Sequence, residues 1–289
     1  MGNVLDSKRN VVFISAITSD IGIALAKRYS KDNYIVAGTY RSKEFLPELS
    51  GLADCHLFYC DLSDKQTIET SIKQFAALGL PWETFISCAA IPTPLTSFFT
   101  SNFDEWSQAI HINAIEQLRV LHSIYPFRNT EVVANVVFFA GPGTNNAVKN
   151  FSAAVISKIM LIKMCELLYV ENVDLNVFII GPGWTKTKAH QRILSDPHVS
   201  PEKYNETLNF LKSQQGTSMD DIYRCIRWLS SQGKTVAGGR NFSVVHDYWG
   251  SEELSRVLLN DSNMYKLRRF RNDWKDKAGK KNDERKTTI

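Results

Sequence analysis

The sequence predicts an α/β protein in which helices cover both faces of one parallel sheet. Short apolar runs rich in β-branched and aromatic residues alternate with longer segments of helical periodicity, and βαβ units produce this alternation. Some of these runs are apolar at nearly every position, as in residues 132–139, where Asn135 is the one polar residue, which is typical of strands buried on both faces of a sheet. We therefore expect a doubly wound parallel sheet of about seven strands in a single domain.

The predicted strands are separated by segments long enough to hold a crossover helix. The first strand, residues 11–15, reads Val-Val-Phe-Ile-Ser, and such side chains suit a pleated and buried segment. Similar runs predict the other strands, at residues 34–39, 55–60, 84–88, 132–139, 175–180 and 242–245. Because crossover connections join parallel strands, we expect neighbouring strands to run in the same direction.

Helical spacing of apolar residues predicts the connecting segments. Ile21, Ala24 and Leu25 recur at helical intervals, so we expect the first helix to begin near Ile21. The same periodicity predicts helices over residues 64–78, within 102–124, and over 150–170, 201–213 and 218–229. The first four of these helices lie between predicted strands, as crossover helices do.

Size and composition indicate one folded unit followed by a charged end. The chain has 289 residues, 44% hydrophobic and 22% charged, which is ordinary for a globular protein. Its net charge of +4 is uneven: residues 266–289 hold ten Lys/Arg and four Asp/Glu, whereas the remaining 24 basic and 26 acidic residues nearly balance. We expect one domain over residues 1–271 and a basic, flexible tail over 272–289.

The sequence carries no clear targeting, membrane or metal signal. No stretch reaches the roughly 18 consecutive apolar residues of a membrane span, and the polar first ten residues leave no room for a signal peptide. The five cysteines are scattered without metal-ligand spacing, which favours reduced thiols in a cytoplasmic protein and no metal site. A basic tail could contact nucleic acid or acidic lipid, but a solvated chain end is the simpler interpretation.

The first strand runs into a turn that could hold a phosphate. Residues 15–22 read Ser-Ala-Ile-Thr-Ser-Asp-Ile-Gly. In an open α/β sheet, a glycine-rich turn at this place lets the backbone approach a pyrophosphate at the positive end of the helix. Only Gly22 remains of three expected glycines, and Ala16 puts a methyl group near the expected pyrophosphate. The turn alone is therefore a weak indication of a dinucleotide site.

Further motifs follow in an order that resembles the short-chain dehydrogenase/reductase family, over about residues 10–250. Residues 15–22 resemble its T-G-x-x-x-G-I-G turn, residues 60–62 its D-[VL] motif at the adenine, and residues 182–187 its P-G-x-x-x-T motif at the nicotinamide. Residues 87–90, Ser-Cys-Ala-Ala, stand where the family has N-N-A-G. The resemblance implies a Rossmann-like fold and a cofactor site formed by Ser15, Ile17, Ser19, Asp20, Ile21, Gly22, Tyr40, Arg41, Asp61, Leu62, Ala89, Lys158, Pro182, Gly183, Thr185 and Thr187.

The end of the second strand predicts which dinucleotide is bound. Residues 39–42, Thr-Tyr-Arg-Ser, lack the carboxylate that would bind the hydroxyls of an unphosphorylated ribose. Arg41 could instead pair with a 2′-phosphate, although an exposed loop arginine is the alternative interpretation. We therefore expect NADP as the cofactor, in preference to NAD.

The residues that perform hydride-transfer chemistry in this family are only partly present. The resemblance implies a tyrosine that exchanges the proton, a lysine one helical turn later, a serine that polarises the carbonyl group and an asparagine that maintains a water relay. Lys158 matches the lysine and Asn113 the asparagine, but Ala154 stands at the tyrosine position and Gly141 at the serine position. None of the ten tyrosines has a lysine four residues on, so no other alignment restores the pair.

Neighbouring polar residues offer few replacements. Ser152 lies two positions before Ala154, about 200° around the helix, so we expect it to face elsewhere. Lys149 could donate a proton, but a solvated loop lysine is the simpler interpretation. Lys158 can still bind ribose hydroxyls without catalysis, and Asn113 could be a structural asparagine that bends its helix.

Three functions are compatible with this sequence. The first is an NADP(H)-binding protein with a degenerate active site, acting as a sensor, scaffold or regulatory subunit without ordinary dehydrogenase activity. The second is an active NADP-dependent oxidoreductase with a displaced acid, of polysaccharide or lipid biosynthesis, and the third is a non-catalytic interaction module. We expect a homodimer or homotetramer, since the helices within 102–124 and over 150–170 form the dimer face in the family. An unknown small molecule is the other expected partner; the case for nucleic acid or membrane is not strong.

Overall fold

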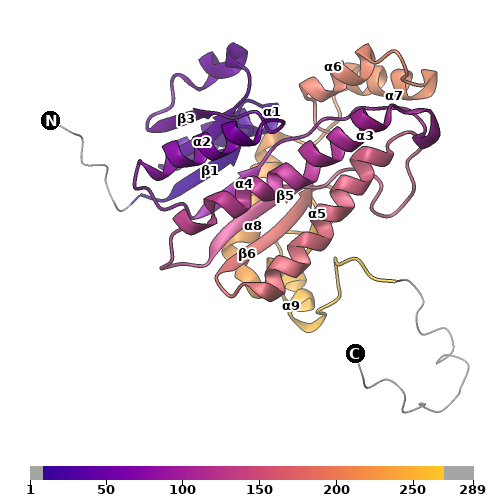
Figure 1. Cartoon of the computed structure of the whole chain (residues 1–289). Helices are drawn as coiled ribbons and strands as arrows, with labels where there is room; N and C mark the ends of the chain where they lie inside the picture. The colour runs from indigo at the N-terminus through magenta and orange to yellow at the C-terminus, as the bar shows by residue number, and fades with distance from the viewer. Residues whose placement is uncertain (1–8, 270–289) are drawn as a thin grey trace, which may run out of the picture.

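The computed structural model describes residues 9–269, in which one sheet forms the middle layer of a three-layer α/β fold (Figure 1). The side chains of α2, α4 and α5 pack against one face of the sheet, and those of α1, α8 and α9 against the other. This confirms the predicted doubly wound fold. The predicted tail, residues 272–289, lies outside the described residues.

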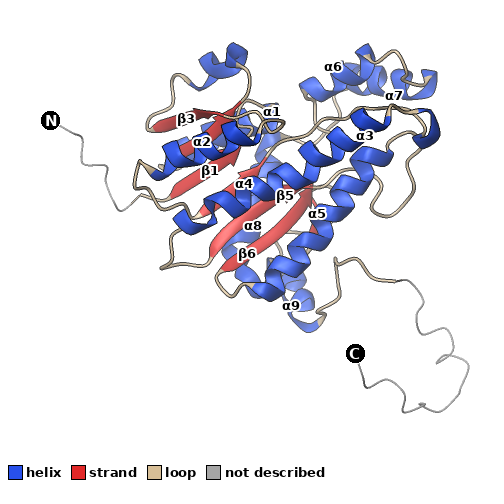
Figure 2. Cartoon of the chain, viewed as in Figure 1, coloured by secondary structure: helices blue, strands red, loops and turns tan. Residues whose placement is uncertain are grey.

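All seven strands in the described part of the chain are parallel, in the order β3-β2-β1-β4-β5-β6-β7 (Figure 2). Their bounds are β1 Val11–Ser15, β2 Ile35–Tyr40, β3 Cys55–Tyr59, β4 Thr84–Ser87, β5 Ala134–Phe139, β6 Leu175–Gly181 and β7 Asn241–Ser243. Each corresponds to a predicted strand. β5 begins two residues later than expected, because Val132 and Val133 precede the paired register and are exposed.

The observed helices differ from the predicted ones where a helix is short or its residues are mostly polar. They are α1 Asp20–Lys31, α2 Lys65–Ala76, α3 Phe103–Ile110, α4 Glu116–Ile124, α5 Ser152–Glu171, α6 Lys188–Ser195, α7 Pro201–Lys212, α8 Met219–Ala237 and α9 Glu252–Asn260. The helix expected within 102–124 is divided into α3 and α4 by a π-helical turn, His111–Ile115. α6, α9 and the 3₁₀ helix η1 (Lys43–Leu49) were not expected, because none is long enough for apolar periodicity to identify it.

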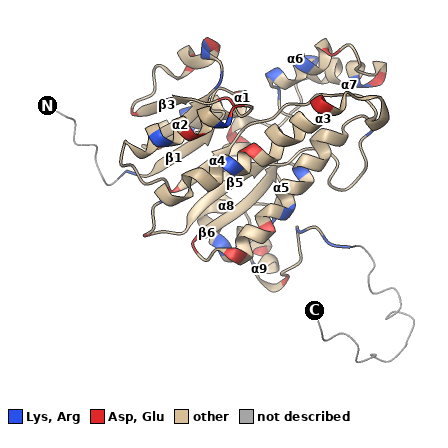
Figure 3. Cartoon of the chain, viewed as in Figure 1, with Lys and Arg blue, Asp and Glu red and all other residues tan. Residues whose placement is uncertain are grey.

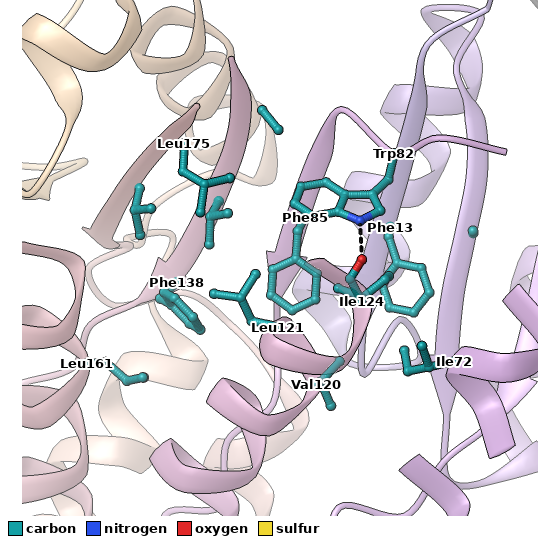
Figure 4. Packing of buried hydrophobic residues seen from close by; sticks show 14 of the residues in the cluster. Phe13, Ile72, Trp82, Phe85, Val120, Leu121, Ile124, Phe138, Leu161 and Leu175 are labelled. Atoms are coloured by element: carbon teal, nitrogen blue, oxygen red, sulfur yellow. Dashed lines mark hydrogen bonds between the residues drawn. The ribbon is translucent and has the colours of Figure 1, made fainter. Parts of the chain in front are cut away.

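Aromatic side chains fill the core between the sheet and α2, α4 and α5. Phe13 stacks on Phe85 with ring centroids 6.0 Å apart, and Phe75 packs edge-on against Phe13 at 5.0 Å. The indole of Trp82 is fully buried and donates a hydrogen bond of 2.8 Å to the carbonyl of Ile124 (Figure 4). This bond satisfies a carbonyl at the end of α4, where no intrahelical donor remains, and so fixes α4 against the sheet.

The strand order fixes where a ligand can bind. β1 lies between β2 and β4. The connection that follows β1 therefore runs toward one edge of the sheet, and the connection that follows β4 runs toward the other edge. A crevice opens at such a reversal point, beyond the carboxyl ends of the strands. Elsewhere, Lys and Arg are interspersed with Asp and Glu over the helices visible in Figure 3. Among the described helices, none has the length and apolar character needed to cross a membrane.

Candidate functional site

The turn from β1 to α1 is held close to the end of β2. The amides of Ala16 and Ile17 both donate to Thr39, to its hydroxyl at 3.1 Å and its carbonyl at 2.8 Å. Ala16 occupies the first glycine position of the motif and has φ of 56°, a left-handed conformation that costs a non-glycine residue about 1–2 kcal/mol. The methyl group noted in the sequence is therefore accommodated at the expense of backbone strain.

The start of α1 is built by one serine and one glycine. Ser19 is the N-cap, and its hydroxyl accepts a hydrogen bond of 3.0 Å from the amide of Gly22. A Cβ atom at Gly22 would lie 2.7 Å from the carbonyl oxygen of Ile17, so only glycine permits this approach of helix and turn. The one glycine that remains of the motif is thus the one that the packing of α1 requires.

A cleft of ≈ 240 Å³ lies beyond the carboxyl ends of β1 to β4. Its walls come from the β1–α1 turn, the ends of β2, β3 and β4, and the start of α6. The predicted site residues that line it are Ser19, Asp20, Ile21, Arg41, Asp61, Leu62, Ala89 and Thr187. Residues separated by up to 168 positions in the sequence therefore meet at the predicted edge of the sheet.

Other predicted site residues do not line this cleft. Ser15 and Ile17 are fully buried beneath it, and the ring of Tyr40 packs against that of Tyr59, with centroids 6.0 Å apart. Gly183 lines a separate groove and has φ of +74°. The residues outside the cleft lining are Ser15, Ile17, Gly22, Tyr40, Asn113, Lys158, Pro182, Gly183 and Thr185.

Charged groups at the ends of β2 and β3 line the cleft. Arg41 is exposed at the end of β2 and, within residues 9–269, forms no ion pair or side-chain hydrogen bond. The Asp61 carboxylate accepts hydrogen bonds from the amide and hydroxyl of Ser63, at 2.9 and 2.8 Å. One Asp61 oxygen therefore supports its own turn, while the Arg41 guanidinium keeps its donors for a ligand.

Lys158 is a buried cation outside the lining of the cleft. Its side chain is only 8% exposed, and among the described residues it has no hydrogen-bond partner. Burial lowers the pKa of Lys158 to about 8, because the charged ammonium loses its hydration there. Burial also raises the pKa of the Cys88 thiol, to about 12. Cys88 lines the cleft, whereas Lys158 does not.

The residues at the predicted tyrosine and serine positions flank this lysine. Ala154 precedes Lys158 by one turn of α5. A Cβ atom at Gly141 would lie 3.5 Å from Cγ of Lys158, at ordinary contact distance. The lysine thus has two small neighbours without polar side-chain atoms, and position 141 has room for a Cβ atom.

Asn113 has a structural role within the π-helical turn. Its side-chain oxygen accepts from the amide of Ile91, and its side-chain nitrogen donates to the carbonyl of Ile91, both at 2.8 Å. Gln117, which the sequence analysis did not identify, donates to the carbonyls of Asn113 and Ala89, at 2.7 and 3.0 Å. Together they fasten the loop after β4, which forms one wall of the cleft. The sequence did hold one signal for this residue: Gln117 is a polar side chain among the apolar positions that α4 buries.

The residues considered above as substitutes for the missing proton donor either lie away from Lys158 or are exposed to solvent. The Ser152 hydroxyl accepts a hydrogen bond of 2.9 Å from the indole of Trp106, so it faces another helix, as predicted. Lys149 is exposed. Sequence reasoning also missed Phe45, Lys188 and Arg192, which line the cleft from η1 and α6.

A cleft at the reversal point of a doubly wound parallel sheet places the chain in the Rossmann class of α/β proteins. The model of the enoyl-(acyl carrier protein) reductase family matches residues 16–245, which is most of the chain. The chain therefore belongs to this family of short-chain dehydrogenases/reductases. No curated protein sequence matches the chain significantly.

Solved structures of the same fold are distant in sequence. A short-chain dehydrogenase/reductase of Saccharomyces cerevisiae is 16% identical, with a TM-score of 0.74, over 86% of this chain and 98% of that one. A short-chain dehydrogenase of Shigella flexneri complexed with NADP is 17% identical, with a TM-score of 0.68, over 81% and 96%. A mutant 4-hydroxyisoleucine dehydrogenase complexed with NADH and succinate is 20% identical, with a TM-score of 0.68, over 81% and 96%. At these identities the likeness shows the fold.

The buried ammonium of Lys158 predicts an unusual pH dependence of stability. The unfolded chain keeps a proton on this amine up to a pH of about 10, whereas burial lowers the pKa of Lys158 in the folded chain to about 8. Between these values the unfolded state binds more protons, so this residue makes the free energy of unfolding rise with pH. We expect Lys158→Met to remove that rise and to be more stable than wild type near pH 7, by about 1–3 kcal/mol. Denaturant unfolding of both proteins from pH 7 to 10 measures this. Parallel pH profiles, or a variant less stable at pH 7, would contradict it.

Proposed function

We propose that this protein binds NADP(H) and does not perform ordinary hydride-transfer chemistry. The observation that carries the proposal is the environment of Lys158. Both neighbours that stand at the family's hydroxyl positions, Ala154 and Gly141, lack a side-chain proton donor. The cleft is nevertheless present, with its glycine turn, its capped helix and Arg41, which has no partner among the described residues. The protein therefore combines a site for a nucleotide with a site that lacks the usual acid.

The proposed ligand is supported by fold, family and charge. The cleft lies where doubly wound proteins bind dinucleotides, and structural neighbours were solved with NADP or NADH. The choice of NADP rests on Arg41, which is exposed at the end of β2 with no carboxylate partner among the described residues. A guanidinium binds a phosphate with paired, charge-assisted hydrogen bonds, so the 2′-phosphate would distinguish NADP from NAD here.

The residues of the site have distinct roles in this proposal. Ser19 and Gly22 position the start of α1, where backbone amides face a pyrophosphate. Arg41 would hold the 2′-phosphate, and the Ala89 wall would pack against the adjacent ribose. A bound nicotinamide supplies or accepts hydride, but reduction of a carbonyl group also needs a proton at the developing alkoxide. Lys158 would hold ribose hydroxyls, leaving that proton without an obvious donor.

A second candidate is an active reductase whose acid is displaced. It is favoured by the lowered pKa of Lys158, about 8, because an acid works best when its pKa is near the operating pH. In that case Lys158→Met would abolish substrate-dependent NADPH oxidation. Activity that survived this change would exclude Lys158 as the acid.

Calorimetric titration with NADPH and NADH tests the proposed ligand. We expect wild type to bind NADPH more tightly than NADH, because only NADPH carries the phosphate that Arg41 would bind. Arg41→Ala should weaken NADPH binding by about 10-fold or more, since a hydrogen-bonded charge contributes about 1.5–3 kcal/mol, and should leave NADH binding nearly unchanged. Arg256→Ala, which removes an exposed arginine on α9, is the matched control. Equal binding of the two nucleotides by wild type would refute the NADP preference.

Restoring the two hydroxyl groups tests the proposed loss of chemistry. We expect the double variant Ala154→Tyr with Gly141→Ser to reduce members of an aldehyde and ketone panel with NADPH, while wild type and each single variant do not. The space beside Lys158 accepts a serine Cβ at position 141. Ile156→Tyr with Gly141→Ser is the control, because position 156 is 48% exposed on α5. Turnover of the same panel by wild type would show that the proposal is wrong.

A further inference from the structure

The start of α6 is fastened to the start of α1 by a pair of charged residues. The backbone amide of Lys188 donates a hydrogen bond of 2.8 Å to the carboxylate of Asp20, and the Lys188 ammonium lies 3.7 Å from the other oxygen. The same ammonium donates to the carbonyl of Thr18 at 3.3 Å and lies 3.3 Å from the ring centroid of Phe45. These contacts join the turn after β1, η1 and α6 at one edge of the cleft.

The geometry of α6 directs two cations toward the cleft. Thr187 is the N-cap, and its amide donates a hydrogen bond of 3.4 Å to the imidazole of His190, so Lys188 is the first residue of the helix. Arg192 follows by four positions and therefore lies on the same face of the helix. Both residues line the cleft, as does Arg41 at the end of β2. Arg192 is exposed, and within residues 9–269 it forms no ion pair or side-chain hydrogen bond.

The balance of charge in the cleft favours a phosphorylated ligand. The Asp20 carboxylate stands in the first turn of α1, beside the place where a pyrophosphate would approach the helix, and on its own it would repel that anion. Lys188 offsets this charge. Its two oxygen contacts, at 3.3 and 3.7 Å, are long, so the ammonium retains donors for a further partner. With Arg41 and Arg192, three cations face two carboxylates, Asp20 and Asp61, in the lining.

We propose that α6 supplies the second half of the phosphate site: Lys188 binds the pyrophosphate of the dinucleotide, and Arg192 joins Arg41 on the 2′-phosphate. The inference rests on the proposed binding of NADP(H) and extends it to residues outside the motifs. Asp20 then has a positioning role, because its bond to the Lys188 amide holds α6 over the cleft. Nucleotide binding and docking of α6 are thereby coupled.

Titration of four variants with NADPH and NADH tests this inference. Lys188→Met should weaken the binding of both nucleotides about equally, by about 10-fold, because both carry a pyrophosphate. Lys188→Arg, which retains the charge, should bind within a few-fold of wild type. Arg192→Met should weaken NADPH several-fold and leave NADH unchanged. Lys186→Met is the matched control, since that ammonium bonds to the carbonyl of Ser213, away from the cleft.

The outcomes separate this inference from the proposed function. The bond to Asp20 comes from the backbone amide of residue 188, so every variant retains this anchor of α6, and only Lys188→Met and Lys188→Arg alter the additional side-chain contacts. If wild type binds NADPH and Arg41→Ala weakens it, while Lys188→Met and Arg192→Met bind as wild type does, the inference is overturned and the proposed function stands. Equal losses in Lys188→Met and Lys188→Arg would also overturn it, because charge would not be the cause. If wild type binds neither nucleotide, both proposals fail.

Discussion

The close approach of backbone segments at the end of β1 is the constraint on which the site depends. A Cβ atom at Gly38 would lie 2.5 Å from the carbonyl oxygen of Ile14, and one at Gly22 would lie 2.7 Å from that of Ile17. These glycines let β1, β2 and α1 meet without side chains between them. The β1–α1 turn is then fixed at the reversal point of the sheet, and Asp20 on α1 is placed where it can bond to the start of α6.

The same constraint explains how the site tolerates an eroded motif. Position 16 keeps the left-handed conformation, with φ of 56°, although it holds alanine. Its amide bonds to the Thr39 hydroxyl, and the neighbouring amide bonds to the Thr39 carbonyl. These bonds set the backbone path, so the turn keeps its shape without the first glycine. Likewise, Asn113 holds the loop after β4 through Ile91, a role that requires no catalysis.

The sheet could be predicted from the sequence, but only part of the cleft could. Strands such as residues 134–139, apolar except at Asn135, show their burial in composition alone. α6 is short and polar, so neither its existence nor its position could be predicted. The contact between Asp20 and Lys188 joins residues 168 positions apart, and only the fold brings them together. For Asn113 the sequence left two roles open, and the bonds to Ile91 support the structural one.

A crystal structure of the protein grown with NADPH tests the central claim most directly. The account predicts the dinucleotide in the cleft beyond β1, with its 2′-phosphate on Arg41 and its ribose hydroxyls near Lys158. It also predicts that no side-chain hydroxyl lies within hydrogen-bond reach of a carbonyl group placed against the nicotinamide. A cleft without nucleotide at saturating NADPH, or a proton donor from another segment beside the nicotinamide, would contradict it.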